Sequence, residues 1–421
     1  DPGLWPERTK SRIFGDGDMV ETFKKKRGIY LAAALLICLF AGIGYAWSVF
    51  QNPFIQHYGW ADSQVSLTYT ITVLCSTLTS LLLGALIRKL GIMKSVLTGG
   101  VMMGLGLFLT GCMQSSIWEL YIFYGFLTGV GTGLVYPQAM SYVVKLFPEK
   151  PGIASGLGTA AYGAGSILWA PVSSALIRNI SLGSAFKILG IAFLIIIVAG
   201  SFLLKNPPEG YAQALAGAKN TAAGSGMNRG QMVRTGKFYL LFVIFTLALI
   251  AGVIVISQAS PIVQTRLGFG EAAAAVLVSV FAAANMAGRF LWGTLSDKLG
   301  KSLTLKLVLI VCAASMALMA VFTQPVLSVI FMAVTASCYG GTASIITPIL
   351  SEVYGPKYIT ENYGVMYMVF GISALIGPLL ATSLKELGPA PYTAAFIIAA
   401  ALTAVGVILA LFVKIKPYKE A

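Results

Sequence analysis

Residues 272–301 read AAAAVLVSVFAAANMAGRFLWGTLSDKLGK, an apolar run that ends in a charged turn. The run is long enough to cross a bilayer, which takes about 20 apolar residues. One cation, Arg289, lies inside it. A guanidinium keeps its charge at any workable pH, and holding it at membrane depth costs at least about 2.5–3.5 kcal/mol. Arg289 is therefore predicted to be a functional residue.

The composition is that of a polytopic membrane protein. Hydrophobic residues make up 57% of the 421 residues and charged residues only 10%, compared with roughly 25% charged in soluble domains. The five cysteines lie in apolar stretches without a CxxC pattern, and His57 is the single histidine. These features predict no metal site and no cofactor, and they argue against an enzyme because no nucleophile or metal set lies in the core.

The hydropathy pattern predicts an all-α membrane protein of twelve transmembrane helices in two six-helix halves. The first half, 29–204, and the second, 237–413, are separated by a central loop, 205–236, and flanked by tails 1–28 and 414–421. Residues 1–28 are polar and basic and predict a flexible tail. The twelve expected spans are 29–51, 64–87, 96–113, 118–141, 152–177, 183–204, 237–261, 272–296, 302–322, 325–350, 361–384 and 391–413.

The basic residues predict the orientation in the membrane. With both termini in the cytoplasm, the only Lys and Arg residues on the outer side are Arg178, Lys187, Arg266 and Lys385. Basic residues favour cytoplasmic loops, so both termini are expected in the cytoplasm and the protein in the cell (inner) membrane. The same distribution explains the net charge of +14 without a nucleic-acid partner.

The two halves carry related loops after their second spans. Residues 84–94 read GALIRKLGIMK and residues 293–301 read GTLSDKLGK. Both contain a glycine, a charged pair, a second glycine and a lysine, and such internal repeats are typical of secondary transporters with a site between the halves. Asp297 lies close to a helix end, where it can form hydrogen bonds with a neighbouring helix. Such a contact can hold the transporter closed toward the cytoplasm. We therefore expect Asp297 to have a gating role.

Arg289 lacks an obvious acidic partner in the sequence. None of the 15 acidic residues falls at mid-membrane depth in the expected spans. An unpaired buried charge is strongly unfavourable, so the first interpretation is that a substrate carboxylate supplies the anion. The alternative is an arginine bonded to carbonyls and hydroxyls of the protein.

Uncharged residues complete the predicted pocket. Asn285 lies four residues before Arg289 and shares its helix face. Several spans contribute aromatic side chains, most of them with a hydroxyl that needs a partner in a membrane core. The expected pocket residues are Tyr45, Tyr136, Tyr162, Tyr339, Tyr367 and Phe370. One interior cation balances one carboxylate, so a monocarboxylate is favoured over a dicarboxylate.

Four segments resemble the monocarboxylate transporter family and the oxalate/formate antiporters, both in the major facilitator superfamily. They are YVVKLFPEKPGIASGLGTAAYGAG (142–165), GYAWSVFQNPF (44–54), NMAGRFLWGTLSDKLG (285–300) and ENYGVMYMVFG (361–371). The resemblance implies that Arg289 binds the substrate carboxylate and that the five tyrosines named above match aromatic pocket positions.

Two departures from the family pattern are informative. Asn285 stands where animal monocarboxylate transporters carry an aspartate implicated in proton coupling, which puts that proton route in doubt. Phe370 stands where the oxalate antiporter carries a second cation, which argues against a dianion.

Together these features predict a major facilitator fold and a monomeric secondary transporter of short monocarboxylates. Lactate or pyruvate is the expected substrate type, carried with a proton. Anion exchange is the alternative mechanism. Two further alternatives are a membrane sensor on a transporter scaffold and a membrane enzyme. A sensor should carry a large soluble output domain and an enzyme a catalytic residue set, and we find neither in this sequence.

Overall fold

The computed structural model describes residues 16–208, 210–216 and 225–418, and this part of the chain is helical with connecting loops. Ten of its helices are long and apolar enough to cross a bilayer, and Leu67–Leu83 is a shorter apolar helix. Large apolar side chains are exposed along these helices, for example Trp118, Leu291 and Leu379. Exposed apolar surface of this extent is expected where lipid tails replace water.

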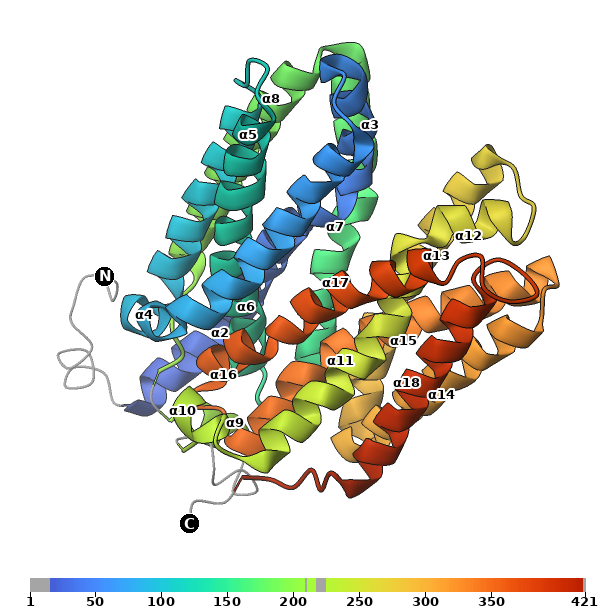
Figure 1. Ribbon diagram of the computed structural model, residues 1–421. Coiled ribbons are helices and arrows are strands. Elements are labelled where there is room, and N and C mark those ends of the chain that lie inside the picture. Colours follow the sequence, from blue (N-terminus) through green and yellow to red (C-terminus); the bar gives the residue numbers. More distant parts are fainter. Residues whose placement is uncertain (1–15, 209, 217–224, 419–421) are drawn as a thin grey trace.

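The first half contains the helices from α2 to α8 (Figure 1). In chain order they are α2 (Asp16–Ala41), η1 (Gly42–Ala46), α3 (Trp47–Tyr58), α4 (Asp62–Thr110), α5 (Ile117–Leu120), η2 (Tyr121–Thr128), α6 (Gly129–Leu146), α7 (Pro151–Asn179) and α8 (Leu182–Leu203).

Two short helices, α9 (Tyr211–Ala216) and α10 (Arg229–Met232), lie in the central loop. The second half follows with α11 (Gly236–Ser257), α12 (Ala259–Thr265), α13 (Glu271–Leu299), α14 (Lys301–Val321), α15 (Pro325–Tyr354), α16 (Ile359–Met366), α17 (Met368–Ser383) and α18 (Thr393–Phe412).

Each of the twelve expected spans coincides with helical structure, but several boundaries differ from the prediction. Helix α2 begins at Asp16, so residues 16–28 of the expected flexible tail are helical, while residues 1–15 lie outside the described part. Helix α4 contains both the second and the third span, which are separated by a kink at Gly91 (φ 75°, ψ 171°). A glycine is favoured there because L-residues rarely adopt positive φ.

The regular α-helical geometry of two spans is interrupted near the candidate site described below. The first span changes at η1 from α-helix to 3-10 geometry, with Ala46 at φ −90° and ψ 6°. The fourth span begins with α5 and then adopts π-helical geometry in η2. Such interruptions are frequent at functional sites.

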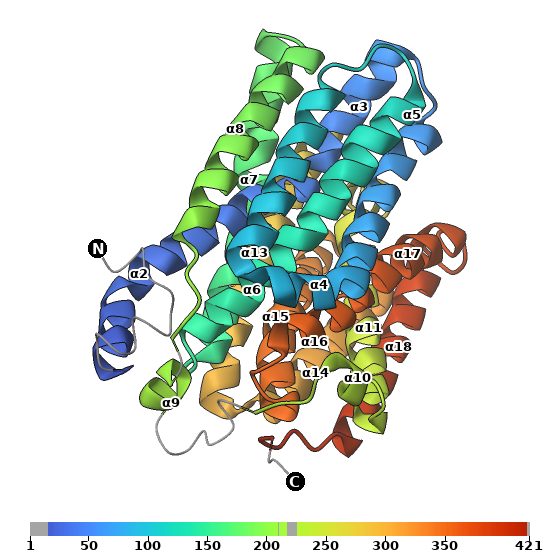
Figure 2. The same ribbon diagram turned by 90° about the vertical axis from the view of Figure 1, so that its left-hand side faces the viewer.

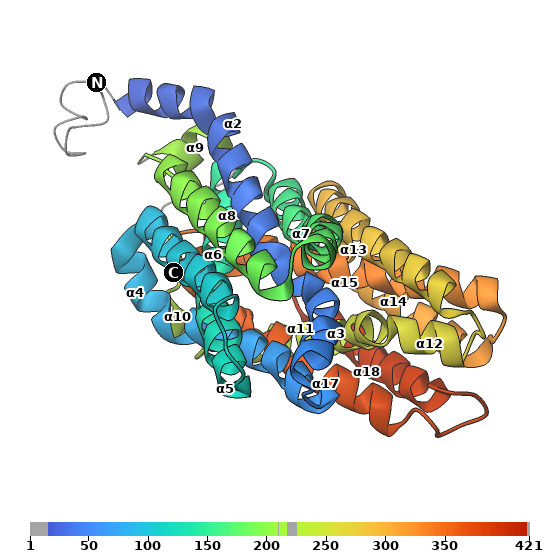
Figure 3. The same ribbon diagram turned by 90° about the horizontal axis from the view of Figure 1, so that it is seen from above.

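The two halves meet along α7, α13, α15, α16, α17, α4 and α6. Viewed from above, the helices numbered up to α8 and those from α11 onward form two neighbouring groups (Figure 3). The tips of α3 and α12 lie far apart on one side of the molecule (Figure 1). On the other side, which carries both ends of the described chain, α16 and α10 lie next to α4 (Figure 2). We call this second side the termini side.

Candidate functional site

Arg289 lies on the buried face of α13. Its side chain is 1% exposed, whereas Leu291, two residues along the same helix, is 61% exposed. One face of α13 is therefore turned toward lipid and the other toward the protein. Asn285, one helical turn before Arg289, is also buried at 9% exposure. Arg289 and Asn285 therefore lie on the same face of α13, as their four-residue spacing predicts.

Three hydrogen bonds hold the guanidinium of Arg289. Its Nε donates to Asn285 Oδ1 at 3.0 Å, and its Nη1 donates to the backbone carbonyl of Thr159 in α7 at 2.7 Å. Its Nη2 donates to the hydroxyl of Tyr45 in η1 at 3.3 Å. The site thus joins α13 of the second half to α7 and η1 of the first half.

Glycines allow α7, α13 and α15 to approach each other at this point. A Cβ on Gly156 would lie 2.8 Å from the Arg289 carbonyl, and a Cβ on Gly163 would lie 3.1 Å from Arg289 Nε. A Cβ on Gly340 would collide with the Asn285 carbonyl. Small residues permit close helix contact in membranes, so the glycines of the segment 142–165 bring Thr159 within reach of the guanidinium.

These partners satisfy hydrogen-bonding groups but leave the positive charge of Arg289 unneutralised. The alternative of an arginine bonded to carbonyls and hydroxyls of the protein describes part of this arrangement, because Asn285, Thr159 and Tyr45 all accept bonds from Arg289. All three are uncharged acceptors. A guanidinium has five N–H groups, and both Nη atoms carry a second one. Arg289 therefore keeps both its charge and N–H groups with which to bind an anion.

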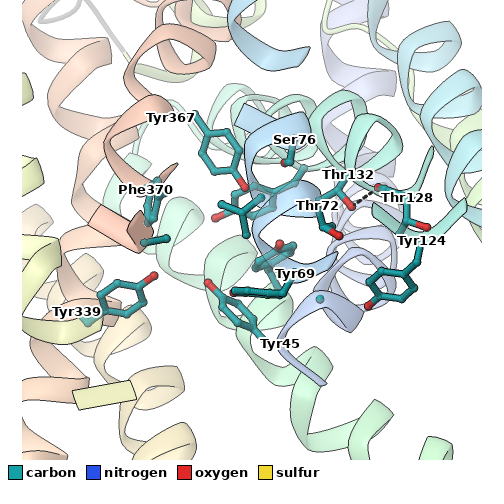
Figure 4. Close-up of a pocket in the computed structure, with 15 residues that line it drawn as sticks. Tyr45, Tyr69, Thr72, Ser76, Tyr124, Thr128, Thr132, Tyr339, Tyr367 and Phe370 are labelled. Atoms are coloured by element: carbon teal, nitrogen blue, oxygen red, sulfur yellow. Dashed lines mark hydrogen bonds between the residues drawn. The ribbon is translucent and has the colours of Figure 1, made fainter. Parts of the chain in front are cut away.

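A cavity of about 80 Å³ lies between the halves beside Arg289. This exceeds the ~10–15 Å³ that one water molecule needs. Six predicted pocket residues line it together: Tyr45, Tyr136, Tyr162, Tyr339, Tyr367 and Phe370. Figure 4 shows Tyr339 and Phe370 of the second half across the cavity from Tyr124 of the first half, with Tyr45 between them.

The aromatic side chains of the cavity contact one another directly. The rings of Tyr136 and Tyr162 lie 4.0 Å apart, and Tyr45 packs edge-on against Tyr162 at 5.2 Å. Tyr367 contacts both Tyr136 at 5.6 Å and Phe370 at 5.4 Å. The sequence placed these residues on five different spans, and the fold gathers them around one space.

Arg289 and Asn285 themselves do not line this cavity. Tyr45 does line it, and its hydroxyl bonds the guanidinium while its ring centre lies 5.7 Å from Arg289 Cζ. Tyr45 thus stands between the cavity and Arg289. In this conformation the aromatic cavity and the guanidinium are therefore adjacent but separated by the Tyr45 side chain.

Several hydroxyl-bearing residues of the first half also line the cavity, and they were not predicted from the sequence. The additional polar residues that line the cavity are Tyr69, Thr72, Ser76, Tyr124, Thr128 and Thr132. The one feature of the sequence that could have indicated these residues is the four-residue spacing of Thr72 and Ser76 and of Thr128 and Thr132. That spacing did not point to a cavity, because such hydroxyls commonly bond their own helix, as Thr132 does to Thr128 O at 2.8 Å.

Asp297 lies in the last turn of α13 and bonds the start of α7. Its Oδ1 accepts from Gly152 N at 2.9 Å and its Oδ2 from Ile153 N at 2.8 Å. A carboxylate is favoured at a helix N-terminus because it satisfies free N–H groups and complements the helix dipole. This contact joins the two halves on the termini side.

Two further contacts join the halves on the same side. Lys145 Nζ donates to Thr360 Oγ1 at 3.4 Å, and Arg229 Nη1 in α10 donates to the Leu81 carbonyl at 3.0 Å. Arg229 follows Met227, whose carbonyl accepts from Asn362 of α16 at 3.0 Å. The central loop therefore helps to hold the termini side together.

Within the described residues, no group of three or more His, Cys, Asp and Glu side chains could hold a metal ion. The chemistry available at the site is therefore that of one guanidinium, one amide, tyrosine rings and hydroxyl groups. Such a set can bind and orient a small anion.

Comparison with known proteins identifies the family. The model of the Major Facilitator Superfamily matches residues 32–358 and 307–421. The chain is 28% identical to the uncharacterized MFS-type transporter YhjX of Escherichia coli, over 84% of this chain and 87% of YhjX. It is 28% identical to the oxalate:formate antiporter of Oxalobacter formigenes, over 92% and 91% of the two chains.

Two further matches agree with this assignment. Monocarboxylate transporter 13 of Rattus norvegicus is 26% identical over 90% of this chain and 86% of the relative. The crystal structure of FucP in the outward conformation superimposes with a TM-score of 0.70 at 16% identity, over 91% of this chain and 98% of FucP. The chain is a multi-pass membrane transporter that belongs to the Major Facilitator Superfamily.

Proposed function

We propose that this transporter carries short monocarboxylates of the lactate and pyruvate type. One observation carries the proposal: Arg289 is a buried guanidinium whose hydrogen-bond partners among the described residues are uncharged, and it lies beside a cavity between the halves. A carboxylate matches the planar fork of a guanidinium and forms charge-assisted hydrogen bonds with it.

The other site residues support a small substrate with one charge. Asn285 orients the guanidinium through Nε. The ring faces and edges of Tyr45, Tyr136, Tyr162, Tyr339, Tyr367 and Phe370 offer apolar contacts for a short carbon chain. Phe370, which lies in the cavity wall, brings no second cation to balance a dianion. The 26% identity to a monocarboxylate transporter is consistent with this substrate class.

Proton symport is the proposed coupling, and anion exchange is the second candidate. Exchange is favoured by the similarity to the oxalate:formate antiporter and by the cavity lining, in which tyrosine is the only ionisable residue type among the described residues. Under symport, the proton would travel with the substrate carboxylate or through the tyrosines and water.

The proposed transport cycle uses the two halves, 29–204 and 237–413, as moving units of a monomer with both termini in the cytoplasm. The Asp297 contact with α7 would then stabilise the state that is closed toward the cytoplasm. Its release would open the cavity to that side.

Uptake of labelled lactate by proteoliposomes tests both function and coupling. Under symport, an inward proton gradient accelerates uptake into liposomes that contain no internal anion. Under exchange, uptake requires internal lactate and does not respond to the gradient. Failure of the purified protein to take up lactate or pyruvate under either condition would reject monocarboxylate transport.

A further inference from the structure

We propose that Tyr45 is an exchangeable partner of Arg289, and that the substrate carboxylate displaces its hydroxyl from the guanidinium. This inference rests on the proposed function and assigns to Tyr45 a role beyond lining the pocket. Substrate binding at Arg289 would then change the conformation of the first membrane span, which contains Tyr45.

The position of Tyr45 supports displacement. Arg289 is 1% exposed and is absent from the cavity lining, whereas Tyr45 belongs to that lining and bonds Arg289 Nη2. A carboxylate in the cavity therefore meets Tyr45 before it meets the guanidinium. Binding to Arg289 requires the Tyr45 side chain to move.

The bond lengths indicate which partner is replaced. Arg289 donates to Thr159 O at 2.7 Å and to Asn285 Oδ1 at 3.0 Å, but to the Tyr45 hydroxyl at 3.3 Å. Hydrogen bonds between a cation and a carboxylate are typically about 2.7–2.9 Å long and roughly twice as strong as neutral ones. A carboxylate therefore competes most easily for the site of the Tyr45 hydroxyl.

The backbone next to Tyr45 is packed less tightly than the start of η1. Gly42 packs tightly on the Tyr162 carbonyl and on Gly165 of α7, which fixes the start of η1. A Cβ on Gly44, by contrast, would meet nothing within 4 Å. Ala46, where η1 passes into α3, departs from helical angles at φ −90° and ψ 6°. Hinges are a few residues that absorb such changes in φ and ψ.

Movement at this hinge would reach α3, which follows directly. Trp47, the first residue of α3, contacts the ring of Tyr124 in η2 at 4.7 Å. Displacement of Tyr45 thus changes the position of α3 relative to the π-helical part of the fourth span. In this way substrate binding at Arg289 is coupled to the side of the molecule where the tips of the two halves lie apart.

Hydrogen exchange tests the anchoring role without any substrate. The parent protein and Tyr45→Phe are compared for exchange of the backbone amides in peptides that cover residues 42–47. If the hydroxyl anchors η1, exchange there is faster in Tyr45→Phe, while peptides of α8 exchange as in the parent. Equal exchange at 42–47 in the two proteins would overturn the proposal.

Lactate affinity tests the displacement itself. In Tyr45→Phe the carboxylate no longer has to break a hydrogen bond, so lactate should bind about tenfold more tightly, the equivalent of one neutral bond. In uptake assays the variant should lower both KM and the maximal rate, because binding is eased and its coupling to the hinge is lost. A weaker or unchanged affinity would contradict displacement.

Tyr142→Phe is the matched control, since it also removes a hydrogen-bonded tyrosine hydroxyl, one that donates to Lys205 O at 2.8 Å outside the cavity. It should leave the lactate affinity unchanged, and an equal gain in this control would also reject the proposal. If the parent protein bound no lactate, the proposed function would fail, while hydrogen exchange at 42–47 would still decide the role of Tyr45.

Discussion

Arg289 and Arg266 are both guanidinium groups bonded by uncharged acceptors, and their differences explain why only Arg289 is assigned to the substrate. Arg266 donates to two carbonyls, Pro391 O at 2.6 Å and Met319 O at 2.7 Å, and to Thr393 Oγ1 at 2.7 Å. It ties together the ends of three helices within the second half. Arg289 instead bonds two side chains that can rearrange, and it lies beside a cavity. We therefore assign a structural role to Arg266 and propose that the partners of Arg289 are exchangeable.

At the residue scale, Asn285→Asp is expected to weaken anion binding. The new carboxylate would lie next to Arg289 Nε, where Asn285 Oδ1 is 3.0 Å away, and would neutralise the guanidinium. Lactate affinity at neutral pH should then fall by more than about tenfold, since two like charges compete for one cation in a poorly solvated site. Asn285→Ala is the control, because it removes the bond without adding charge and should cause a smaller loss. Wild-type affinity in Asn285→Asp would contradict the proposed site.

The sequence predicted which side chains would form the candidate site but not how they are arranged. Arg289, Asn285 and the aromatic residues could be found because a charge in an apolar span and a four-residue spacing are local signals. The screening of Arg289 by Tyr45 could not, since it depends on the 3-10 geometry of η1 and on glycine contacts between α7 and α13. Hydroxyl groups such as Thr72 and Thr132 were missed because serine and threonine are common in buried helices.

At the scale of helices, the close contact between α7 and α13 holds the residues of the candidate site next to each other. Gly152 and Gly293 face each other, and a Cβ on Gly152 would collide with the Gly293 carbonyl. Farther along, Gly156 contacts the Arg289 carbonyl. The same pair of helices carries Asp297, Thr159 and Arg289, so the Asp297 contact and the proposed substrate site share one interface.

Gly152→Ala should therefore separate α7 from α13. The added methyl group has no space, and overpacking of this kind typically costs about 1–3 kcal/mol. We expect a lower midpoint of thermal unfolding and slower lactate uptake. Gly236→Ala is the control, because a Cβ there meets nothing within 4 Å. Unchanged stability and uptake in Gly152→Ala would show that the contact is not tight in the working protein.

Asp297→Asn should shift the transporter away from the conformation described here. The amide keeps one acceptor for the N–H groups of Gly152 and Ile153 but loses the charge that complements the α7 dipole, a change of about 0.3–1 kcal/mol. Spin labels on Ser116→Cys and Gln324→Cys, in a chain without the five native cysteines, would report the distance between the halves on the side opposite the termini. A larger fraction of short distances is expected in Asp297→Asn. An unchanged distribution would argue against gating.

The helices themselves were the most predictable part of the fold. Apolar runs of sufficient length predicted where the helices lie, because a bilayer demands helices of nearly constant length, and ten helices of the described chain are long and apolar enough to cross it. The kink at Gly91, the helical residues 16–28 and the change of geometry in η2 were not predicted. These features depend on packing between helices, to which hydropathy is insensitive.

At the scale of the whole molecule, the contacts that join the halves are concentrated on the termini side. Asp297 with α7, Lys145 with Thr360 and Arg229 with Leu81 all lie there. The tips of α3 and α12 lie apart on the other side (Figure 1). With both termini in the cytoplasm, as proposed, this conformation would face outward.

Cysteine labelling tests that orientation. In a chain without the five native cysteines, Ser116→Cys on the side opposite the termini should react in intact cells with a maleimide that cannot cross membranes. Lys298→Cys, beside the Asp297 contact, should react only after the cells are opened. Both positions are exposed, so the reverse pattern would place the termini outside.

Arg289 is proposed to bind a monocarboxylate through its planar fork, and the most direct test is the lactate affinity of three purified proteins. Calorimetry would compare the parent, Arg289→Lys and the control Arg266→Lys. Lysine is a point charge and cannot form the paired bonds, so Arg289→Lys should bind lactate about 100-fold more weakly, as expected for the loss of a charge-assisted bond. Arg266→Lys should bind lactate as the parent does. Parent-like affinity in Arg289→Lys would contradict the proposed role of Arg289.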